Sequence, residues 1–592
     1  MENLDVARTL EDLADLLEIQ GANPFRVRAY RNAVVTIEGL TRPLQAMVEA
    51  GEDLTELPAV GKDIAAHIVE LLQTGRIGRM EEVTAEFPRS LVELTRLDGV
   101  GPKKARKLFD ELGVRTVDDL VRALADERVE TLAGFGKKSA EKIGRAIERH
   151  RRHVGRYLLD DVEQLVEGVI EHVRKAPGVK RVEFAGSLRR RKETIGDVDL
   201  LAQCEGDGAA VVSHFTAYPG AERVEAAGGT KGNIVLRSGL SIDLRVIPKR
   251  SFGAALQYFT GSKEHNVAVR TRAVKEGLRV NEWGVFRVPE GADPDSLGKE
   301  DGERLAGETE EEVYEALGMR WMPPEIRENR GEVEAARRGR LPKLVALKDI
   351  RGDLQMHSTW SDGKASIEEM ARACLDRGYE YFAITDHSQA MAMVQGLTPA
   401  RAREQWKEID EVRERVPDID ILRSAEVDIL KDGTLDMPDE ILEGLDLVVV
   451  SVHSFMDLDK KTMTDRVLRA IQHPEVDILG HPTGRILNRR EPFELDVEAV
   501  LEAAAELDVA VELNANPNRL DLSDVYVYRA REMGVKVVIS TDAHSPRALA
   551  NMRFGVDQAR RGWLERKHVL NTMTGKELKA WLGRRAAGAT RR

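Results

Sequence analysis

Cysteine is scarce in this chain of 592 residues, which contains only Cys204 and Cys374. Two thiols so far apart in sequence make neither a disulfide framework nor a zinc ribbon, so we expect a reducing compartment. Long apolar runs are missing as well, because no stretch reaches the roughly 20 residues that a membrane-spanning helix needs. The acidic start MENLDVARTLEDL is unlike a signal peptide. These absences predict a cytoplasmic protein that has no membrane partner.

An excess of positive charge is also missing. The net charge of −13 argues mildly against a nucleic-acid partner, but charge acts locally. Between Leu91 and Tyr157 there are 16 Lys+Arg against 11 Asp+Glu, and RRRK follows at 189–192. This basic module is compatible with DNA binding. Taken alone, it fits an ordinary solvated surface better.

The length predicts several domains rather than one core. Amphipathic helical segments come first, strand-like runs alternate with helices next, and a proline-rich, highly charged stretch precedes a final series of apolar strands and helices. The last pattern predicts an α/β barrel, so the fold class is multidomain α/β. The predicted domains are 1–90 (helical), 91–155 (helical, DNA-binding), 156–320 (mixed α/β), 321–343 (linker) and 344–592 (barrel).

The helical region contains a repeat: LPAVGKDIAAHIVELL (57–72), LDGVGPKKARKLFDEL (97–112) and LAGFGKKSAEKIGRAI (132–147). Each copy resembles the helix-hairpin-helix element, whose amides at a helix N-terminus grip the DNA backbone without reading its sequence. One glycine turn is weak support, because many helix–helix connections need glycine, but three copies favour DNA binding. The expected backbone-binding residues are Gly99, Gly101, Lys103, Lys104, Gly134, Gly136, Lys137 and Lys138.

A first catalytic pattern lies in AGSLRRRKETIGDVDLL (185–201). Asp197 and Asp199 stand two apart on a predicted strand, so both carboxylates face the same side. The later strand LSIDLRVIP supplies Asp243, and three such carboxylates suit two Mg²⁺ ions bound to substrate phosphates. Gly186 and Ser187 open a turn followed by three arginines, which suits a triphosphate. An isolated D-x-D pair would more simply cap a sheet edge; the full set favours a nucleotidyltransferase.

These motifs, together with ALQYFTGSKEHNVAVRTRAVKEGLRVNEWGVFR (255–287), resemble DNA polymerase family X, the group of DNA polymerase beta. The resemblance runs from NPFRVRAYRNA (23–33) to TEEEVYEALGMRWMPPEIRE (309–328) and implies a nucleotidyltransferase palm, a nascent-pair-binding subdomain and a thumb-like region. It implies that Asp197 and Asp199 bind both metals and that Asp243 helps to activate the primer 3′-hydroxyl. The other implied roles are triphosphate binding (Gly186, Ser187 and Arg190), the sugar pocket (Tyr258, Phe259 and Gly261) and the nascent pair or template (Asn266 and Arg270).

The first hairpin departs from this family. Its lyase members carry, on the helix of the first hairpin, a lysine that attacks an abasic sugar as a Schiff base. His67 stands at that position here, and the turn reads AVG rather than GVG. Because an imidazole forms no Schiff base, we expect little deoxyribose-phosphate lyase activity from the lyase-like region 1–90.

A second catalytic pattern follows the strands of the C-terminal half. Apolar strands end repeatedly in side chains that can bind metals: Asp386 and His387, Glu426, His453, His481, and Asp542 and His544. Barrel enzymes place their chemistry at these carboxyl ends of the strands. A single such histidine is more often structural, but five of the chain's 13 histidines, including His357, lie at strand ends here. The set predicts a polynuclear metal site.

This set is similar to the PHP (polymerase and histidinol phosphatase) domain, a (β/α)7-type barrel that binds three metals. The family opens with H-x-H, where this chain has Gln355-Met-His357. The resemblance implies one metal at His357, Glu426 and Asp542, with Gln355 in place of a histidine. It implies a second at Glu426, His453 and His481, and a third at Asp362, His387 and His544. One amide among these ligands should shift preference from Zn²⁺ toward Mn²⁺.

Bacterial family X polymerases fused to a PHP domain resemble nearly the whole chain. They imply a monomeric, nucleoid-associated DNA repair enzyme that fills gaps with dNTPs on gapped or nicked DNA. They also imply a 3′→5′ exonuclease with related 3′-end or abasic-site phosphodiesterase activity. Three alternatives stay open: a DNA-end-processing phosphoesterase whose polymerase half mainly binds gapped DNA, a non-catalytic DNA scaffold, and a small-molecule phosphatase.

Overall fold

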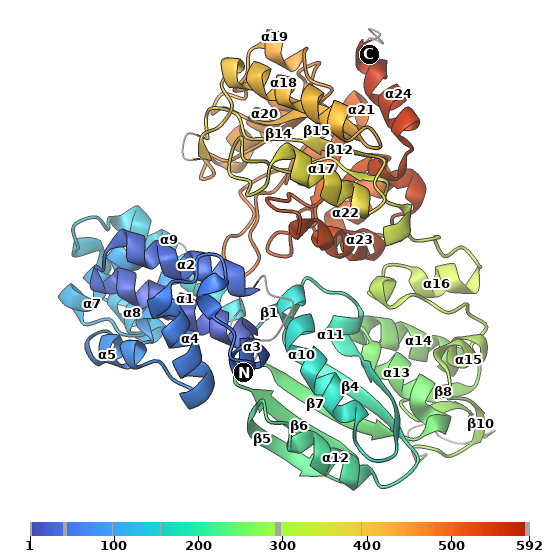
Figure 1. Cartoon of the computed structure of the whole chain (residues 1–592). Helices are drawn as coiled ribbons and strands as arrows, with labels where there is room; N and C mark the ends of the chain where they lie inside the picture. The colour runs from blue at the N-terminus through green and yellow to red at the C-terminus, as the bar shows by residue number, and fades with distance from the viewer. Residues whose placement is uncertain are drawn as a thin grey trace. The chain divides into compact units, whose positions relative to one another are not determined.

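A computed structural model of the chain describes residues 3–38, 44–97, 99–153, 155–289, 298–391 and 394–586 (Figure 1). Two compact units divide it. One comprises Met1–Val182, Gly206–Val246 and Asn488–Arg490, and the other comprises Glu183–Glu205, Ile247–Leu487 and Glu491–Arg592. Among the described residues, no helix is long and apolar enough to cross a membrane.

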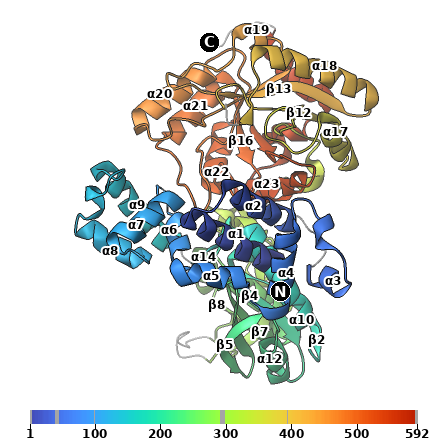
Figure 2. The same ribbon diagram turned by 60° about the vertical axis from the view of Figure 1, so that its left-hand side comes forward.

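The N-terminal region is a helical bundle whose core is built from apolar residues of every helix. The helices α1 and α2 lie side by side, and α7, α8 and α9 gather next to α6 (Figure 2). The helices are α1 (Asn3–Gln20), α2 (Pro24–Glu38), α3 (Leu44–Glu49), α4 (Lys62–Thr74), α5 (Gly78–Glu86), α6 (Leu91–Thr95), α7 (Pro102–Leu112), α8 (Val117–Ala125) and α9 (Lys137–His153), with short 3-10 turns η1 (Leu54–Glu56) and η2 (Val129–Thr131).

The three hairpins share one backbone conformation. Gly99 and Gly134 take left-handed φ angles of 87° and 88° before the helices α7 and α9. Ala59 holds the corresponding position before α4 with φ 60°, which costs an alanine about 1–2 kcal/mol relative to its preferred conformations. The hairpin therefore keeps its shape even where the sequence lacks glycine.

Mixed α/β structure follows. In the first unit, β5, β6 and β7 form an antiparallel meander, with Asn233 of β6 opposite Asp243 of β7, and α12 packs on β5 and β6. In the second unit, β8, β9 and β10 form a three-stranded antiparallel sheet in the order β10-β9-β8. The elements are β1 (Tyr157–Leu158), α10 (Leu159–Arg174), β2 (Val179–Phe184), α11 (Gly186–Arg189), β3 (Thr194–Ile195), β4 (Asp197–Cys204), α12 (Gly208–Thr216), β5 (Ala221–Gly228), β6 (Lys231–Leu236), β7 (Ser241–Ile247), η3 (Lys249–Ser251), α13 (Phe252–Thr260), α14 (Lys263–Lys275), β8 (Leu278–Asn281), β9 (Gly284–Arg287), β10 (Glu303–Ala306) and α15 (Glu310–Glu315).

The charged stretch 321–343, which the sequence suggested as a linker, contains η5 (Pro324–Ile326) and α16 (Glu332–Arg337). Its charges are used in internal ion pairs. Arg327 is completely buried and donates a hydrogen bond to Glu310 at 2.6 Å. This highly charged segment can therefore pack into the structure, because its buried cation has a carboxylate beside it.

Seven parallel strands form the C-terminal barrel in the order β11-β12-β13-β14-β15-β16-β17. Every residue of β12, β14, β16 and β17 is buried, which explains their near-continuous apolar sequences. The predicted multidomain α/β class, with a helical N-terminal region and a C-terminal barrel, is confirmed. The strands are β11 (Gly352–Asp353), β12 (Tyr381–Ile384), β13 (Asp420–Asp428), β14 (Leu447–Ser451), β15 (Ile478–Leu479), β16 (Ala510–Asn514) and β17 (Val537–Ser540).

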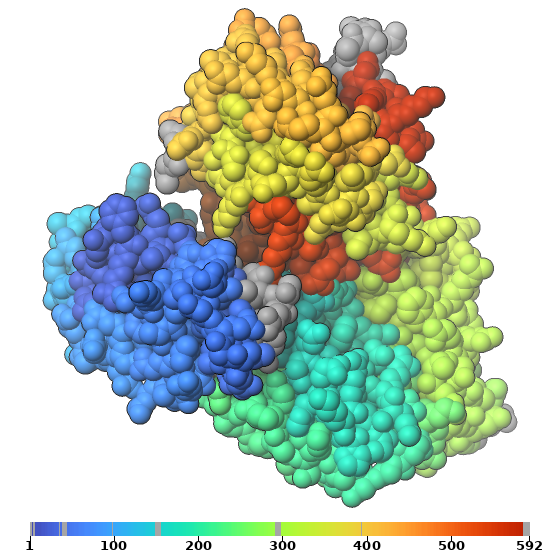
Figure 3. Space-filling view, viewed as in Figure 1, coloured from blue at the N-terminus to red at the C-terminus, as the bar shows by residue number. Residues whose placement is uncertain are grey.

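Helices surround the strands of the barrel, as the ribbon of Figure 1 shows, and the barrel region forms the yellow and orange surface of Figure 3. One end is closed by an apolar layer in which Leu578 and Trp581 of α24 pack with Leu354, Leu422 and Val538 of the barrel. Polar side chains are thereby concentrated at the other end. The barrel helices are α17 (Ile367–Asp376), α18 (Pro399–Arg415), α19 (Asp439–Leu442), α20 (Lys460–Ile471), α21 (Val497–Leu507), α22 (Asp524–Met533), α23 (Met552–Arg561) and α24 (Gly575–Ala586), with 3-10 turns η6 (Leu347–Asp349), η8 (Ala548–Asn551), η9 (Arg566–His568) and η10 (Leu570–Thr572).

Candidate functional site

The predicted metal ligands of the barrel come together where the strands end. His357 follows β11, His387 follows β12, and Glu426 lies within β13 near its end. The candidate ligands His453, His481 and Asp542 are each the second residue after the end of a strand, β14, β15 and β17 respectively. Because parallel strands all point the same way, their carboxyl ends meet on one face of the barrel.

Glu426 is the centre of this cluster. Its carboxylate is 1% exposed and has four imidazoles around it. Oε1 lies 3.0 Å from Nε2 of His481 and 3.4 Å from Nε2 of His453. Oε2 lies 3.2 Å from Nδ1 of His387 and 3.6 Å from Nε2 of His357. Burial favours the neutral acid, but His453 and His387 hold the pKa of Glu426 well below its ordinary value. A bridging, ionised carboxylate is the outcome.

A second group forms around Asp362. His544 Nε2 lies 3.2 Å from Asp362 Oδ2, and His387 Nε2 lies 3.7 Å from the same oxygen. His357 Nε2 lies 3.1 Å from Asp542 Oδ1. Two sets of side chains have ligand atoms close enough to hold one metal ion each: His357, Asp362, His387 and His544, and His387, Glu426 and His453.

The donor chemistry fits a cation. His544 Nδ1 must carry a proton, because it lies 2.8 Å from the carbonyl oxygen of Asp542 and can only donate to it. The Nε2 atom of a neutral ring then turns its lone pair toward the Asp362 carboxylate. Two acceptors that face each other need a proton or a metal ion between them. Without a metal, a proton occupies His544 Nε2 and the ring is charged. Burial opposes this charge, but Asp362 and Asp542 raise the pKa of His544 to about 9.

Gln355 is the altered position. It is completely buried, and neither its Oε1 nor its Nε2 has a hydrogen-bond partner among the described residues. A buried amide without partners costs free energy, so a binding partner for the oxygen is expected. Gly480 lies beside it: a Cβ added there would be in ordinary contact with Gln355 Oε1 at 3.5 Å, but only 2.4 Å from Ser451 Oγ. The amide therefore fits the ligand position that the resemblance implied.

Backbone strain marks two of the candidate ligands. Asp542 and His481 have positive φ angles of 53° and 23°, in a region that costs about 1–3 kcal/mol for residues other than glycine. Glu512 of β16 helps to hold His481, because its carboxylate accepts the His481 backbone N–H at 2.5 Å. The sequence analysis did not select Glu512. Its position on a barrel strand next to β15 is the signal that could have found it.

Two further residues near Asp542 were also missed. The amide of Asn514 donates a hydrogen bond to Asp542 Oδ2 at 3.1 Å. Arg519 Nε lies 3.7 Å from the same oxygen, while Arg519 NH1 is buried and has no partner among the described residues. Both lie in the sequence VELNANPNR (511–519), which contains the end of β16 and the loop after it, where the same rule of strand ends applies.

Asp386, which the sequence placed beside His387, has a different environment. It is completely buried and accepts hydrogen bonds from Ser358 (2.5 and 2.8 Å), Ser361 (2.5 Å) and Gln405 (2.6 Å). With its oxygens occupied in this way, Asp386 anchors the loop that carries His357. His387 alone of this pair faces the ligand cluster.

The polymerase motif begins at a tight contact. Gly186 has φ 60°, and a Cβ added there would lie 2.7 Å from Asp199 Oδ2. The N–H of Ala185 donates to the carbonyl of Asp199 at 2.8 Å, which fixes this turn against β4. Asp197 is exposed at the start of β4, and Ser187 lies half-buried in α11.

Arg190 is held by groups of the same unit. Its NH1 donates to the carbonyl of Thr260 at 2.5 Å, and its Nε donates to Glu328 at 3.0 Å. The side chain is 12% exposed. Asp243 lies on β7 in the other compact unit, half-buried and opposite Asn233.

The predicted sugar and base contacts cluster around the end of α13. Tyr258 and Phe259 meet edge to face with ring centroids 5.1 Å apart, and the exposed Arg270 lies 5.0 Å over the Tyr258 ring. Asn266 accepts from Gln257 at 2.9 Å and donates to the Tyr258 carbonyl at 2.7 Å. Gly261 follows the last residue of α13 and has φ 65°. A Cβ added there would lie 3.2 Å from Arg190 NH1.

The hairpins present open amides. An added Cβ at Gly101, Gly134 or Gly136 would meet nothing within 4 Å, so the surface above them is accessible. The side chains of Lys103, Lys137 and Lys138 are exposed. Lys104 is used internally: its ammonium donates to the Gly99 carbonyl at 2.9 Å and lies 5.3 Å from the centre of the Phe135 ring. Three of the four predicted lysines are thus exposed to solvent.

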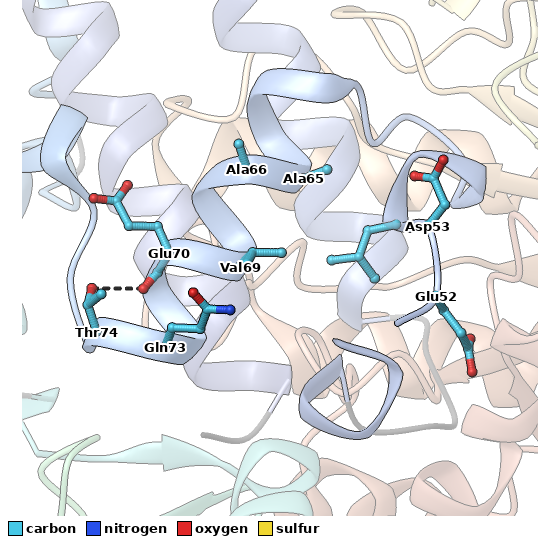
Figure 4. A pocket seen from close by; sticks show the side chains of 9 residues that line it. Glu52, Asp53, Ala65, Ala66, Val69, Glu70, Gln73 and Thr74 are labelled. Carbon is cyan, nitrogen blue, oxygen red and sulfur yellow. Dashed lines mark hydrogen bonds between the residues drawn. The ribbon is translucent and has the colours of Figure 1, made fainter. Parts of the chain in front are cut away.

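A pocket lies beside the first hairpin, between α4 and the loop before it (Figure 4). Its described polar lining includes Glu52, Asp53 and Glu70 but neither lysine nor arginine, so it repels phosphate rather than binding it. His67 of the same helix hydrogen-bonds to the Tyr30 hydroxyl at 2.9 Å. Burial lowers the pKa of His67, which keeps the imidazole neutral.

Comparison with known families accounts for these parts. Residues 1–77 match a helix-hairpin-helix domain, residues 91–149 a SAM-like helix-hairpin-helix tandem, residues 255–328 the DNA polymerase beta thumb, and residues 353–516 the PHP domain. Together with the fold, the matches define a DNA polymerase beta-like chain that carries a C-terminal PHP domain.

One relative extends over the whole chain. The DNA polymerase/3′-5′ exonuclease PolX of Bacillus subtilis (strain 168) is 39% identical over 586 residues, which is 99% of this chain and 100% of the relative. The chain therefore belongs to the PolX family of DNA polymerase/3′-5′ exonucleases, which confirms the resemblance seen in the sequence.

Two other relatives match parts of the chain. DNA polymerase lambda of Arabidopsis thaliana is 26% identical over 322 residues, which is 50% of this chain and 57% of the relative. A probable phosphatase of Thermoanaerobacter sp. (strain X514) is 29% identical over 232 residues, which is 37% of this chain and 89% of the relative.

Proposed function

We propose that this chain fills gaps in DNA with its polymerase half and processes 3′ ends with its PHP barrel, as one repair enzyme. The observation that carries the proposal is full-length identity to a polymerase/exonuclease in a chain that keeps Asp197, Asp199 and Asp243 together with the ligand cluster around Glu426. Its substrates are gapped or nicked DNA and dNTPs. It acts as a monomer at the nucleoid of the cytoplasm.

Divalent cations supply the Lewis acidity for both reactions when bound: Mg²⁺ at the three aspartates, and up to three Mn²⁺ or Zn²⁺ ions at the barrel. The chain's own part in nucleotide addition is positioning. The amide of Gly186, the hydroxyl of Ser187 and the guanidinium of Arg190 hold the triphosphate. Tyr258 and Gly261 line the sugar pocket.

Asn266 and Arg270 lie against Tyr258, where they contact the nascent base pair or the template. The exposed lysines of the hairpins bind the DNA backbone without reading sequence. This division predicts strong salt dependence of DNA binding, because backbone contacts release counterions.

At the barrel, the residues assigned to metals are Gln355, His357, Asp362, His387, Glu426, His453, His481, Asp542 and His544. Glu426 would serve more than one of these ions, since both of its oxygens face imidazoles. Arg519 has an unpaired buried N–H beside Asp542, and we assign it to the phosphate of the 3′ end. Abasic-site phosphodiesterase activity would use the same groups.

One substrate tests the proposal. A gapped duplex is incubated with and without dNTPs, using wild type, Asp197→Ala and Asp542→Ala. Asp197→Ala should lose nucleotide addition and keep 3′-end degradation, and Asp542→Ala should do the reverse. Loss of both activities in either variant would contradict two separate sites.

The alternative of a DNA-end-processing phosphoesterase is decided by the same assay. If the polymerase half mainly binds gapped DNA, the wild-type protein degrades the 3′ end but incorporates no nucleotide with Mg²⁺ and dNTPs. Nucleotide incorporation by the wild type that disappears in Asp197→Ala would exclude the phosphoesterase alternative.

A further inference from the structure

The phosphate-binding turn of the polymerase is tied to the exonuclease barrel inside one compact unit. Residues 189–193 belong to this unit together with α23 of the barrel. Arg191 Nε donates to Asp557 of α23 at 2.7 Å. Glu193 accepts two hydrogen bonds from Arg485 at 3.2 and 2.7 Å, and one from Gln558 at 3.3 Å.

Arg561, the last residue of α23, makes the most direct link. It is 2% exposed, and its NH1 donates to the backbone carbonyl of Arg190 at 2.7 Å. The same NH1 lies 3.0 Å from Glu328 Oε1, and NH2 donates to Asp524 at 2.7 Å. A buried guanidinium with carboxylates on both sides has a fixed position, because breaking such a pair leaves an uncompensated buried charge.

The arrangement also sets the charge of the turn. Glu328 Oε1 accepts hydrogen bonds from both Arg190 and Arg561, each at 3.0 Å. Burial raises the pKa of Glu328, but Arg561 and Arg190 hold it below its ordinary value, so this carboxylate is ionised. Two carboxylates, Glu328 and Asp524, therefore face three guanidinium groups, those of Arg190, Arg561 and Arg330. The group keeps a net positive charge, whereas an isolated Arg190–Glu328 pair would be neutral overall.

We propose that α23 of the exonuclease barrel is a structural part of the polymerase's nucleotide site, with Arg561 as the positioning residue for Arg190. Arg561 fixes the Arg190 backbone through the carbonyl and leaves its guanidinium charge available to a triphosphate. The inference rests on the proposed function, because it takes Arg190 as a triphosphate ligand. It adds that the PHP barrel contributes to dNTP binding in addition to its own chemistry.

The test distinguishes an effect on dNTP binding from effects on DNA binding and on exonuclease activity. Single-nucleotide gap filling is measured with full-length Arg561→Gln, Arg561→Lys and Arg190→Ala, together with DNA affinity and exonuclease rate. Arg561→Gln should raise KM for dNTP about tenfold, with a smaller change in kcat, because a hydrogen bond to a charged group is lost. DNA affinity and exonuclease rate should stay within about twofold of wild type.

Arg560→Gln is the matched control. Arg560 is the preceding residue of the same helix and is bound to Glu325 at 2.7 Å and to the Val345 carbonyl at 3.1 Å. Neither of these two contacts involves residues 189–193, so the KM of Arg560→Gln for dNTP should equal that of wild type.

Arg561→Lys keeps the buried positive charge and guards against misfolding of the glutamine variant. A single ammonium cannot reproduce the planar fork that reaches the Arg190 carbonyl, Glu328 and Asp524 together, so KM for dNTP should rise at least about threefold. A wild-type KM in the folded Arg561 variants, with a raised KM in Arg190→Ala, would overturn this inference and leave the proposed nucleotide site standing. A wild-type KM in Arg190→Ala would overturn the proposed site itself.

Discussion

Replacing Gly186 by alanine should damage the polymerase while leaving the exonuclease intact. The new Cβ would lie 2.7 Å from Asp199 Oδ2, where ordinary contacts begin at 3.4 Å. The Asp199 carbonyl is held by the Ala185 N–H at 2.8 Å, so the carboxylate has to rotate away rather than move with its strand. The resulting displacement is more than about half an ångström, which exceeds the tolerance of a catalytic group.

Two magnitudes follow from this geometry. Alanine at φ 60° costs about 1–2 kcal/mol of stability, because the left-handed region is unfavourable for residues with a Cβ. Displacement of Asp199 should lower kcat for nucleotide addition by about 100-fold, or about 2.7 kcal/mol of transition-state stabilisation.

The assay is single-turnover gap filling with Mg²⁺, run beside 3′-end degradation with Mn²⁺. Gly144→Ala in α9 is the control, since an added Cβ meets nothing within 4 Å there. If Gly186→Ala adds nucleotides at the wild-type rate, the Asp199 carboxylate tolerates the new Cβ, and the predicted displacement is wrong.

Four other perturbations have defined outcomes. Gln355→His should move exonuclease activity and bound metal from Mn²⁺ toward Zn²⁺, measured by elemental analysis and by activity in each metal; identical profiles would contradict its role as a ligand. Borohydride trapping on an incised abasic site should give little adduct, because His67 occupies the lysine position, and strong trapping would show that another amine serves. Ala59→Gly should raise the free energy of unfolding by about 1 kcal/mol in urea denaturation, since φ is 60° there; no gain would argue against a left-handed turn. Neutral His568 accepts the Glu565 backbone N–H at 3.0 Å, and burial together with nearby cations lowers its pKa from 6.5 to about 4. The unfolded chain therefore binds the extra proton between these pH values, and stability falls as the pH drops through this window. His568→Asn, which keeps an acceptor without a charge, should flatten that part of the stability profile, and an unchanged profile would exclude His568 as its source.

The barrel could be predicted from sequence because its ligands obey a simple rule. Strands with every residue buried read as apolar runs, and a polar residue directly after such a run must lie at the carboxyl end. That rule found His453, His481 and Asp542 without any knowledge of contacts. It missed Arg519, which lies several residues beyond β16. The conformation of the loop after β16 brings Arg519 near Asp542, and the sequence pattern does not encode that conformation.

Other features depend on packing that local sequence does not encode. The arginines after Ser187 read as three equivalent phosphate ligands, yet Arg189 is bound to Glu310 at 2.7 Å and Arg191 to Asp557 at 2.7 Å. Their partners are distant in the chain, so the run of arginines alone does not separate them from Arg190, which only the family resemblance singled out. The stretch 321–343 was interpreted as a linker for the same reason, because charge predicts exposure unless the opposite charge is known.

As a ligand in the proposed assignment, Gln355 would change the chemistry of the metal site without changing its charge. The ligand set contains three carboxylates, Asp362, Glu426 and Asp542, and the position that differs exchanges one neutral donor for another. The Coulomb attraction for a divalent cation is therefore retained, and what changes is the softness of a single donor atom. An oxygen in place of a nitrogen weakens the site most for Zn²⁺ and least for Mn²⁺. On the proposed assignment, the buried amide, unpartnered among the described residues, would change which metal the barrel prefers rather than abolish metal binding.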